Sequence, residues 1–159
     1  MKEFNITGLC VPHEHYMVDI SGKIDEILKL VHKKRYFTIN RARQYGKTTT
    51  LHMLQNALSQ DEQYLCVSIS FEEMSVASFD SESNFCKMFL RKVSDALKFS
   101  DADEEYSAQW NNPDVTDIDM LSRHITKMCE NKKVVLMIDE VDKSTNNRLF
   151  LHLDRKSVV

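Results

Sequence analysis

The sequence predicts an α/β fold in which helices cover both faces of a parallel sheet. Residues 134–138 are apolar at every position, as expected of a strand buried between two layers. Segments with helical periodicity alternate along the chain with strand-like segments, which is typical of parallel sheets. The 159 residues include only 3 glycines and 2 prolines, too few for the many turns of a β-sandwich or barrel.

The first half of the chain contains two predicted helices and two predicted strands. Apolar residues at positions 24, 27, 28 and 31 form one helical face, and we expect Ser21 to cap this helix. Residues 36–39 are predicted to form a strand. Leucines at positions 51, 54 and 58 predict a second helix after Gly46, and the β-rich residues 64–70 predict a strand that ends near Phe71.

The second half contains two further helices and the last strand. Apolar positions from Phe85 to Leu97 predict a long helix. The stretch of residues 100–114 is rich in acidic residues, contains Trp110 and Pro113, and is predicted to be a surface loop. Trp110 is interpreted as a local packing residue. Thr116 and Asp119 resemble a capping box in front of a helix that reaches Met128. Residues 134–138 are the third strand.

Composition places the chain among soluble cytoplasmic proteins. It carries 21 basic and 24 acidic side chains, a formal net charge of −3, and 42% hydrophobic residues. No apolar run approaches the length of about 20 residues that a membrane helix needs, and no secretion signal follows the N-terminus. The four cysteines are widely spaced, so we expect free thiols rather than disulfides.

Residues 39–50 place Gly46, Lys47 and Thr48 between a predicted strand and a predicted helix. A phosphate-binding loop needs backbone N–H groups at a helix N-terminus, a lysine for the β and γ phosphates, and a hydroxyl for Mg²⁺. The first glycine of the usual G-x-x-x-x-G-K-[ST] pattern is replaced by Arg41.

The same region is strongly basic, which leaves a nucleic-acid-binding alternative open. No acidic residue lies between Glu26 and Asp61. The basic residues of this stretch are Lys29, Lys33, Lys34, Arg35, Arg41, Arg43 and Lys47. Such a cluster could bind nucleic-acid phosphates, and that binding would weaken steeply with salt.

The strand at residues 134–138 runs directly into two carboxylates, Asp139 and Glu140. At the carboxyl end of a parallel strand, Asp139 is placed to hold Mg²⁺ through water, and Glu140 to orient or deprotonate a water that attacks the γ-phosphate. Together with the upstream Gly-Lys-Thr, this pair predicts a nucleoside triphosphate site.

The two motifs resemble those of the bacterial AAA-like ATPases, P-loop NTPases near the AAA and STAND groups. Residues 37–49 look like the Walker A variant of that group, in which an arginine-rich segment commonly replaces the first glycine. Residues 139–142 are similar to its Walker B strand end, and residues 15–19 look like its N-terminal segment. The likeness covers most of residues 4–150.

This resemblance implies a three-layer P-loop fold, ATP and Mg²⁺ as cofactors, and a set of site residues. Glu140 and Lys47 are the expected catalytic residues, and Thr48 and Asp139 the expected Mg²⁺ ligands. The expected nucleotide-binding residues are Arg43, Gln44, Tyr45, Gly46, Lys47, Thr48 and Thr49. Adenine as the base is expected from the resemblance alone.

Folds of this kind order their central strands 5-1-4-3-2, and this chain offers only strands 1 to 3. We therefore expect a C-terminally truncated chain that is not a stable ATPase alone. Its expected parts are a flanking segment with a helix (1–34), the P-loop core (35–153) and a non-native tail (154–159).

The sequence thus predicts ATP binding, with ATP hydrolysis as the reaction of the full-length protein. The alternatives are a non-hydrolysing nucleotide switch or interaction module, and a nucleic-acid-binding protein. A homo-oligomer or an effector domain is the expected further partner, and no membrane is. His13, Glu14 and His15 near Cys10 are zinc-type ligands, but their spacing fits no strong pattern, so we expect a turn around Pro12 there.

Overall fold

The computed structural model describes residues 2–4, 13–16, 18–39, 46–72, 74–100 and 102–141. The chain divides into unit 1, Met1–Asp61, and unit 2, Glu62–Val159, and each unit is described by itself. Among the described residues, no helix combines the length and the apolar character that crossing a membrane requires.

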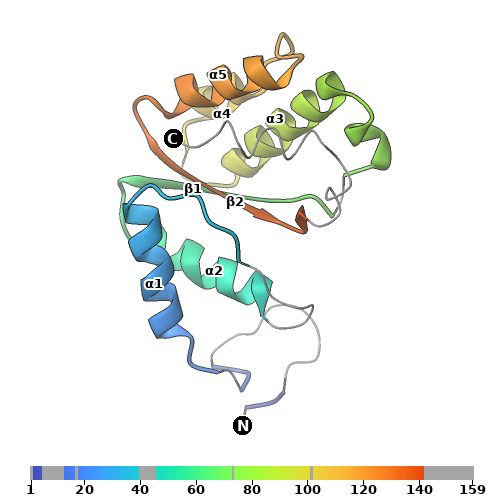
Figure 1. Cartoon of the computed structure of the whole chain (residues 1–159). Helices are drawn as coiled ribbons and strands as arrows, with labels where there is room; N and C mark the ends of the chain where they lie inside the picture. Colours follow the sequence, from blue (N-terminus) through green and yellow to red (C-terminus); the bar gives the residue numbers. More distant parts are fainter. Residues whose placement is uncertain are drawn as a thin grey trace. The chain divides into compact units, whose positions relative to one another are not determined.

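Unit 1 is built on two helices that pack against each other, α1 (Ser21–His32) and α2 (Lys47–Leu58) (Figure 1). Both were predicted from their apolar periodicity. Ile24 and Ile27 are buried on α1, and Leu54 and Leu58 on α2. Ahead of α1, Glu3 and His15 form an isolated parallel bridge.

Two local predictions in unit 1 are wrong. Ser21 is the first residue of α1 rather than its cap, and its N–H donates to Asp19 Oδ1 at 2.9 Å. Residues 36–39 are neither helix nor strand. A strand exists only where a neighbour completes its hydrogen-bond ladder, and no described segment pairs with these residues.

Unit 2 contains a two-stranded parallel sheet of β1 (Tyr64–Ser70) and β2 (Lys133–Asp139). Ser70 is the register partner of Asp139, so both strands end at the same edge. This pairing confirms the two later predicted strands and agrees with the expected order, in which they are neighbours.

Three helices of unit 2 lie on one side of this sheet: α3 (Glu82–Lys98), α4 (Glu104–Trp110) and α5 (Ile118–Cys129) (Figure 1). A short 3₁₀ helix, η1 (Val76–Phe79), precedes α3. Val67 and Ile69 of β1 join Phe85 and Phe89 of α3 in the core. Within unit 2 alone, these helices cover one face of the sheet, whereas the sequence predicted two covered faces.

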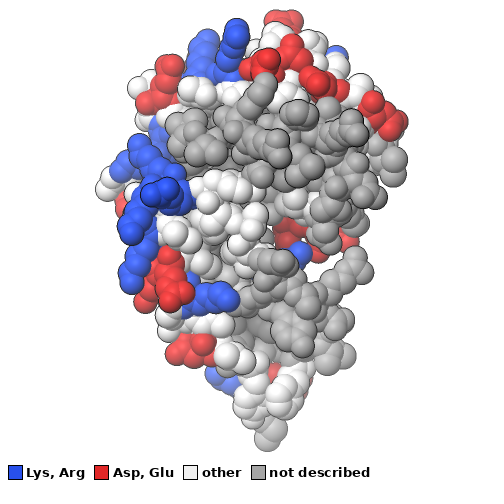
Figure 2. Space-filling view, viewed as in Figure 1, with Lys and Arg blue, Asp and Glu red and all other residues white. Residues whose placement is uncertain are grey.

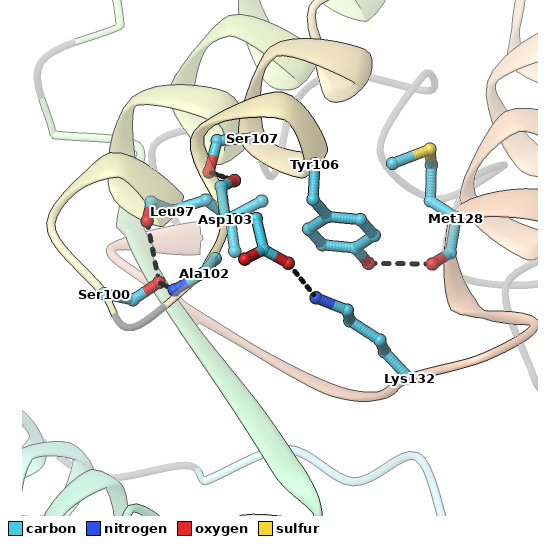
Figure 3. A network of polar contacts seen from close by, with 8 residues as sticks. All are labelled: Leu97, Ser100, Ala102, Asp103, Tyr106, Ser107, Met128 and Lys132. Atoms are coloured by element: carbon cyan, nitrogen blue, oxygen red, sulfur yellow. Dashed lines mark hydrogen bonds and ion pairs between the residues drawn. The ribbon is translucent and has the colours of Figure 1, made fainter.

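The predicted surface loop at residues 100–114 is wrong, because residues 104–110 form α4. Side chains at α4 contact the end of α5 and the segment that follows α5 (Figure 3). The Tyr106 hydroxyl donates to the Met128 carbonyl at 2.7 Å, and the Lys132 ammonium lies 3.4 Å from Asp103 Oδ2. Trp110, 2% exposed, packs in the core as expected of a packing residue.

The cap of α5 also differs from the prediction. Asp117 is the N-cap, and its Oδ1 accepts the Met120 N–H at 2.8 Å, so the Thr116 capping box is wrong by one residue. A second contact comes from α3, where Glu82 Oε2 accepts the Ile118 N–H at 3.2 Å. Two residues distant in sequence, Glu82 and Asp117, thus accept hydrogen bonds from backbone N–H groups at the start of α5.

Candidate functional site

Gly46 is the turning point at the start of α2. Its backbone is left-handed, with φ 72° and ψ 29°, a conformation that glycine adopts without the Cβ clash of other residues. Its carbonyl accepts the Thr50 N–H at 2.9 Å and the Thr50 hydroxyl at 2.8 Å. The glycine of the Gly-Lys-Thr motif therefore sets the direction in which α2 begins.

Lys47, Thr48 and Thr49 form the first turn of α2, at the positive end of its helix dipole. Lys47 is half-buried, Thr48 is exposed and Thr49 is buried. No acidic residue lies in this turn to offset its partial positive charge. A helix start of this kind attracts anions, phosphate groups above all.

Part of the predicted nucleotide-binding set lies outside the described residues. These residues are Arg41, Arg43, Gln44 and Tyr45. The described members, Gly46 to Thr49, occupy the helix start that the sequence predicted for them.

A separate set of candidate residues lies at the carboxyl end of β2 in unit 2. Asp139 is the last residue of the strand, and Glu140 follows it directly; both side chains are half-buried. Asp139 Oδ1 accepts the backbone N–H of Glu140 at 2.9 Å. This hydrogen bond restrains the Asp139 carboxylate against the backbone of Glu140.

Glu140 has a left-handed backbone, with φ 55°. This conformation is uncommon for a residue with a Cβ, and strained residues of this kind cluster at functional sites. The predicted catalytic carboxylate therefore belongs to the strained residue that directly follows β2.

Sequence reasoning missed the end of β1, which lies beside Asp139. Ser70 is the register partner of Asp139, and the Phe71 N–H donates to the Asp139 carbonyl at 3.1 Å. Ser70 Oγ accepts the Glu72 N–H at 3.1 Å. Because functional groups gather at the carboxyl ends of parallel strands, the polar end of residues 64–70 was a usable signal.

Neither zinc nor thiol chemistry gains support from the described residues. His13 Nε2 lies 3.3 Å from Glu14 Oε1, Cys10 is not described, and no described group of His, Cys, Asp or Glu could hold a metal ion as a cluster. Cys66 and Cys86 are buried free thiols, as predicted, and burial raises the pKa of Cys86 to about 11.

Comparison with known proteins identifies the family. No curated protein and no solved structure matches the chain significantly. A family model described as an AAA-like domain matches residues 20–153, the greater part of the chain, and this range includes Gly46 to Thr48 and Asp139 and Glu140. The expected N-terminal segment at residues 15–19 lies before this match. The chain therefore belongs to the AAA-like domain family.

Proposed function

We propose that this chain binds Mg·ATP and that the full-length protein hydrolyses it. Membership of the AAA-like domain family suggests an ATPase-like, nucleotide-binding protein. The observation that carries the proposal is Gly46, whose left-handed backbone places Lys47 and Thr48 at the start of α2. Glycine, lysine and a hydroxyl residue at a helix N-terminus are the parts that a phosphate loop requires.

In this proposal, unit 1 supplies the groups that bind the phosphates. The backbone N–H groups of the first turn of α2 donate to phosphate oxygens, and the Lys47 ammonium neutralises charge on the β and γ phosphates. Phosphoryl transfer depends mainly on such positioning and charge stabilisation. Lys47 is thus the residue on which ATP affinity depends most.

The donor set fits Mg²⁺. The Thr48 hydroxyl and the Asp139 carboxylate are hard oxygen donors, and Mg²⁺ prefers one or two such protein ligands together with phosphate oxygens and water. When bound, Mg²⁺ supplies charge neutralisation on the transferring phosphoryl group. The Asp139 carboxylate is oriented in part by the Glu140 N–H.

Glu140 acts in this proposal as the base for hydrolysis. As the water oxygen bonds to the γ-phosphorus, the bond between that phosphorus and the bridging β-phosphate oxygen breaks, and the water proton moves to the Glu140 carboxylate. General-base catalysis contributes about 10²–10⁴-fold to a rate. Loss of this carboxylate removes the acceptor without removing the phosphate-binding groups.

Glu140→Gln in the full-length protein tests the proposal. We expect ATP hydrolysis to fall by at least about 100-fold while ATP affinity is retained. Glu130→Gln, an exposed change of the same kind in unit 2, is the control and should leave both unchanged. A wild-type protein that binds ATP without turnover would show a nucleotide switch, and equal turnover in the Glu140 variant would refute the assigned role.

A further inference from the structure

The C-terminal end of α1 carries a cluster of cations that the proposed ATP chemistry does not use. The cluster, named here the basic patch, consists of Lys29, Lys33, Lys34 and Arg35. All four side chains are exposed. Lys and Arg side chains are visible over α1, with some acidic side chains among them (Figures 1 and 2).

The positive charge of the basic patch is not offset locally. Within the described residues, none of its four cations forms an ion pair with a carboxylate, although Asp25 lies one helical turn before Lys29. No acidic residue occurs in the sequence between Glu26 and Asp61. In a chain of net charge −3, this end of α1 is a local site of attraction for a polyanion.

The backbone of the patch is strained at Lys34. Its N–H donates to the Val31 carbonyl at 2.8 Å, and the Arg35 N–H donates to the Leu30 carbonyl at 3.0 Å, the paired bonds of a Schellman cap. Lys34 takes the left-handed position of this cap, with φ 52°, where glycine is strongly preferred. A lysine at this position adds charge at a cost in backbone strain, which points to a use for that charge.

An aromatic side chain follows the patch directly. Tyr36 is 54% exposed and comes immediately after Arg35. Cations next to an exposed aromatic ring are the combination that binds single-stranded nucleic acid, through backbone phosphates and base stacking. A membrane surface would instead require large apolar side chains beside the cations; α1, which is described in full, exposes only Leu30 of this kind, at 37%.

We propose that the basic patch binds the phosphate backbone of single-stranded nucleic acid and that Tyr36 stacks on a base. Binding is independent of sequence, because the contacts are to phosphates and to the face of a base. The site lies at the C-terminal end of α1 and in the residues that directly follow it, and it does not depend on the proposed ATP site at the start of α2.

The proposal predicts how steeply oligonucleotide affinity falls with salt concentration. Each phosphate contact to a single strand contributes about −0.7 to the slope of log K against log salt concentration, so four cations predict a slope of about −2.8. Between about 50 and 200 mM salt, affinity should fall about 50-fold. Fluorescence anisotropy of labelled oligo(dT) and oligo(U), each about 15 nucleotides long, measures this slope on the full-length protein.

A variant with all four patch cations changed to glutamine should lose oligonucleotide binding and its salt slope, while ATP affinity is unchanged. The matched control changes an equal number of exposed cations, again three lysines and one arginine, to glutamine. The control residues are Lys2, Lys87, Arg123 and Lys127. The control should retain both the affinity and the slope, because its cations lie outside the patch.

Lys34→Gly separates binding from folding. Glycine fits the left-handed cap position better than lysine, so we expect this variant to melt at the same temperature as the wild type or higher. It should nevertheless bind oligonucleotide about 5-fold more weakly at about 0.1 M salt, with a slope smaller by about 0.7. A loss of binding with no loss of stability cannot come from unfolding.

Three results would overturn the proposal. One is the absence of oligonucleotide binding by the wild type at about 50 mM salt. Another is equal binding by the wild type and the patch variant. The third is binding to phosphatidylserine vesicles without binding to either oligonucleotide, which would assign the patch to a membrane surface. If the protein fails to bind ATP, this test still applies, because oligonucleotide binding is measured without any nucleoside triphosphate.

Discussion

Replacing Glu140 with glycine is expected to stabilise unit 2 while it removes the proposed catalytic base. Glu140 has φ 55°, in the left-handed region where a Cβ is crowded. Glycine has no Cβ and adopts this conformation readily. The hydrogen bond from the residue 140 N–H to Asp139 Oδ1 is a backbone contact and is retained in the variant.

Two opposing effects set the magnitude. Relief of the left-handed strain contributes about 1–2 kcal/mol. The greater freedom of glycine in the unfolded chain costs about 0.5–1 kcal/mol. With the middle of each range, the net gain is about 0.75 kcal/mol, which corresponds to a rise of about 3–6 °C in the melting temperature of a domain of about 60–100 residues.

Glu140→Ala is the matched control, because it also removes the carboxylate but keeps the Cβ. Thermal unfolding of both variants, followed by circular dichroism under the same conditions, isolates the Cβ strain. Both variants should lack ATP turnover. A glycine variant that melts at or below the alanine variant would refute the argument that Glu140 is a strained residue.

Two further predictions concern unit 2. Asp117→Ala removes the acceptor of the Met120 N–H and should lower the free energy of unfolding by about 1 kcal/mol in urea titrations, whereas Thr116→Ala should have little effect; the reverse order would restore the capping box. Burial lowers the pKa of His124 below its ordinary 6.5, so the unfolded chain binds a proton first as pH falls. Stability should therefore decline below about pH 6.5, and a decline of the same size in His124→Phe would contradict this cause.

The spacing of apolar residues in the sequence was sufficient to predict the helices and strands that bury one apolar face. The predicted helices over α1, α3 and α5 and the predicted strands over β1 and β2 are confirmed. The helix α4 was missed because its acidic residues and Pro113 nearby suggested a loop. Glu104 and Glu105 in its first turn, with Tyr106 and Trp110 one turn apart, were the overlooked helix signals.

Features that depend on distant partners could not be predicted. The strand at residues 36–39 was inferred from β-propensity alone, and its existence depends on a neighbour that the sequence does not identify. The contact of Glu82 with the Ile118 N–H joins residues far apart in the chain. Caps shifted by one residue, as at Asp117, because several polar residues at a helix start compete for the same N–H groups.

The sequence predicted that a helix begins after Gly46 and that a strand ends beside Asp139 and Glu140, but it did not predict the backbone conformation of these residues. Glycine before lysine was a usable but overlooked signal of the left-handed start of α2, because few other residues tolerate that conformation. No comparable signal marked Glu140, whose positive φ breaks the preference of its residue type. Ser70 was missed because its place beside Asp139 follows from strand register, which pairing determines.

The affinity of the full-length protein for Mg·ATP, measured by isothermal titration calorimetry with and without Lys47→Ala, tests the central claim most directly. Lys23→Ala is the control, since Lys23 is an exposed lysine of α1 that belongs to neither the proposed ATP site nor the basic patch. We predict binding by the wild type and by Lys23→Ala, and no detectable binding by Lys47→Ala, because Lys47 supplies the charge for the β and γ phosphates. Equal ATP affinity in all three proteins would contradict the assignment of residues 46–48 as a phosphate loop.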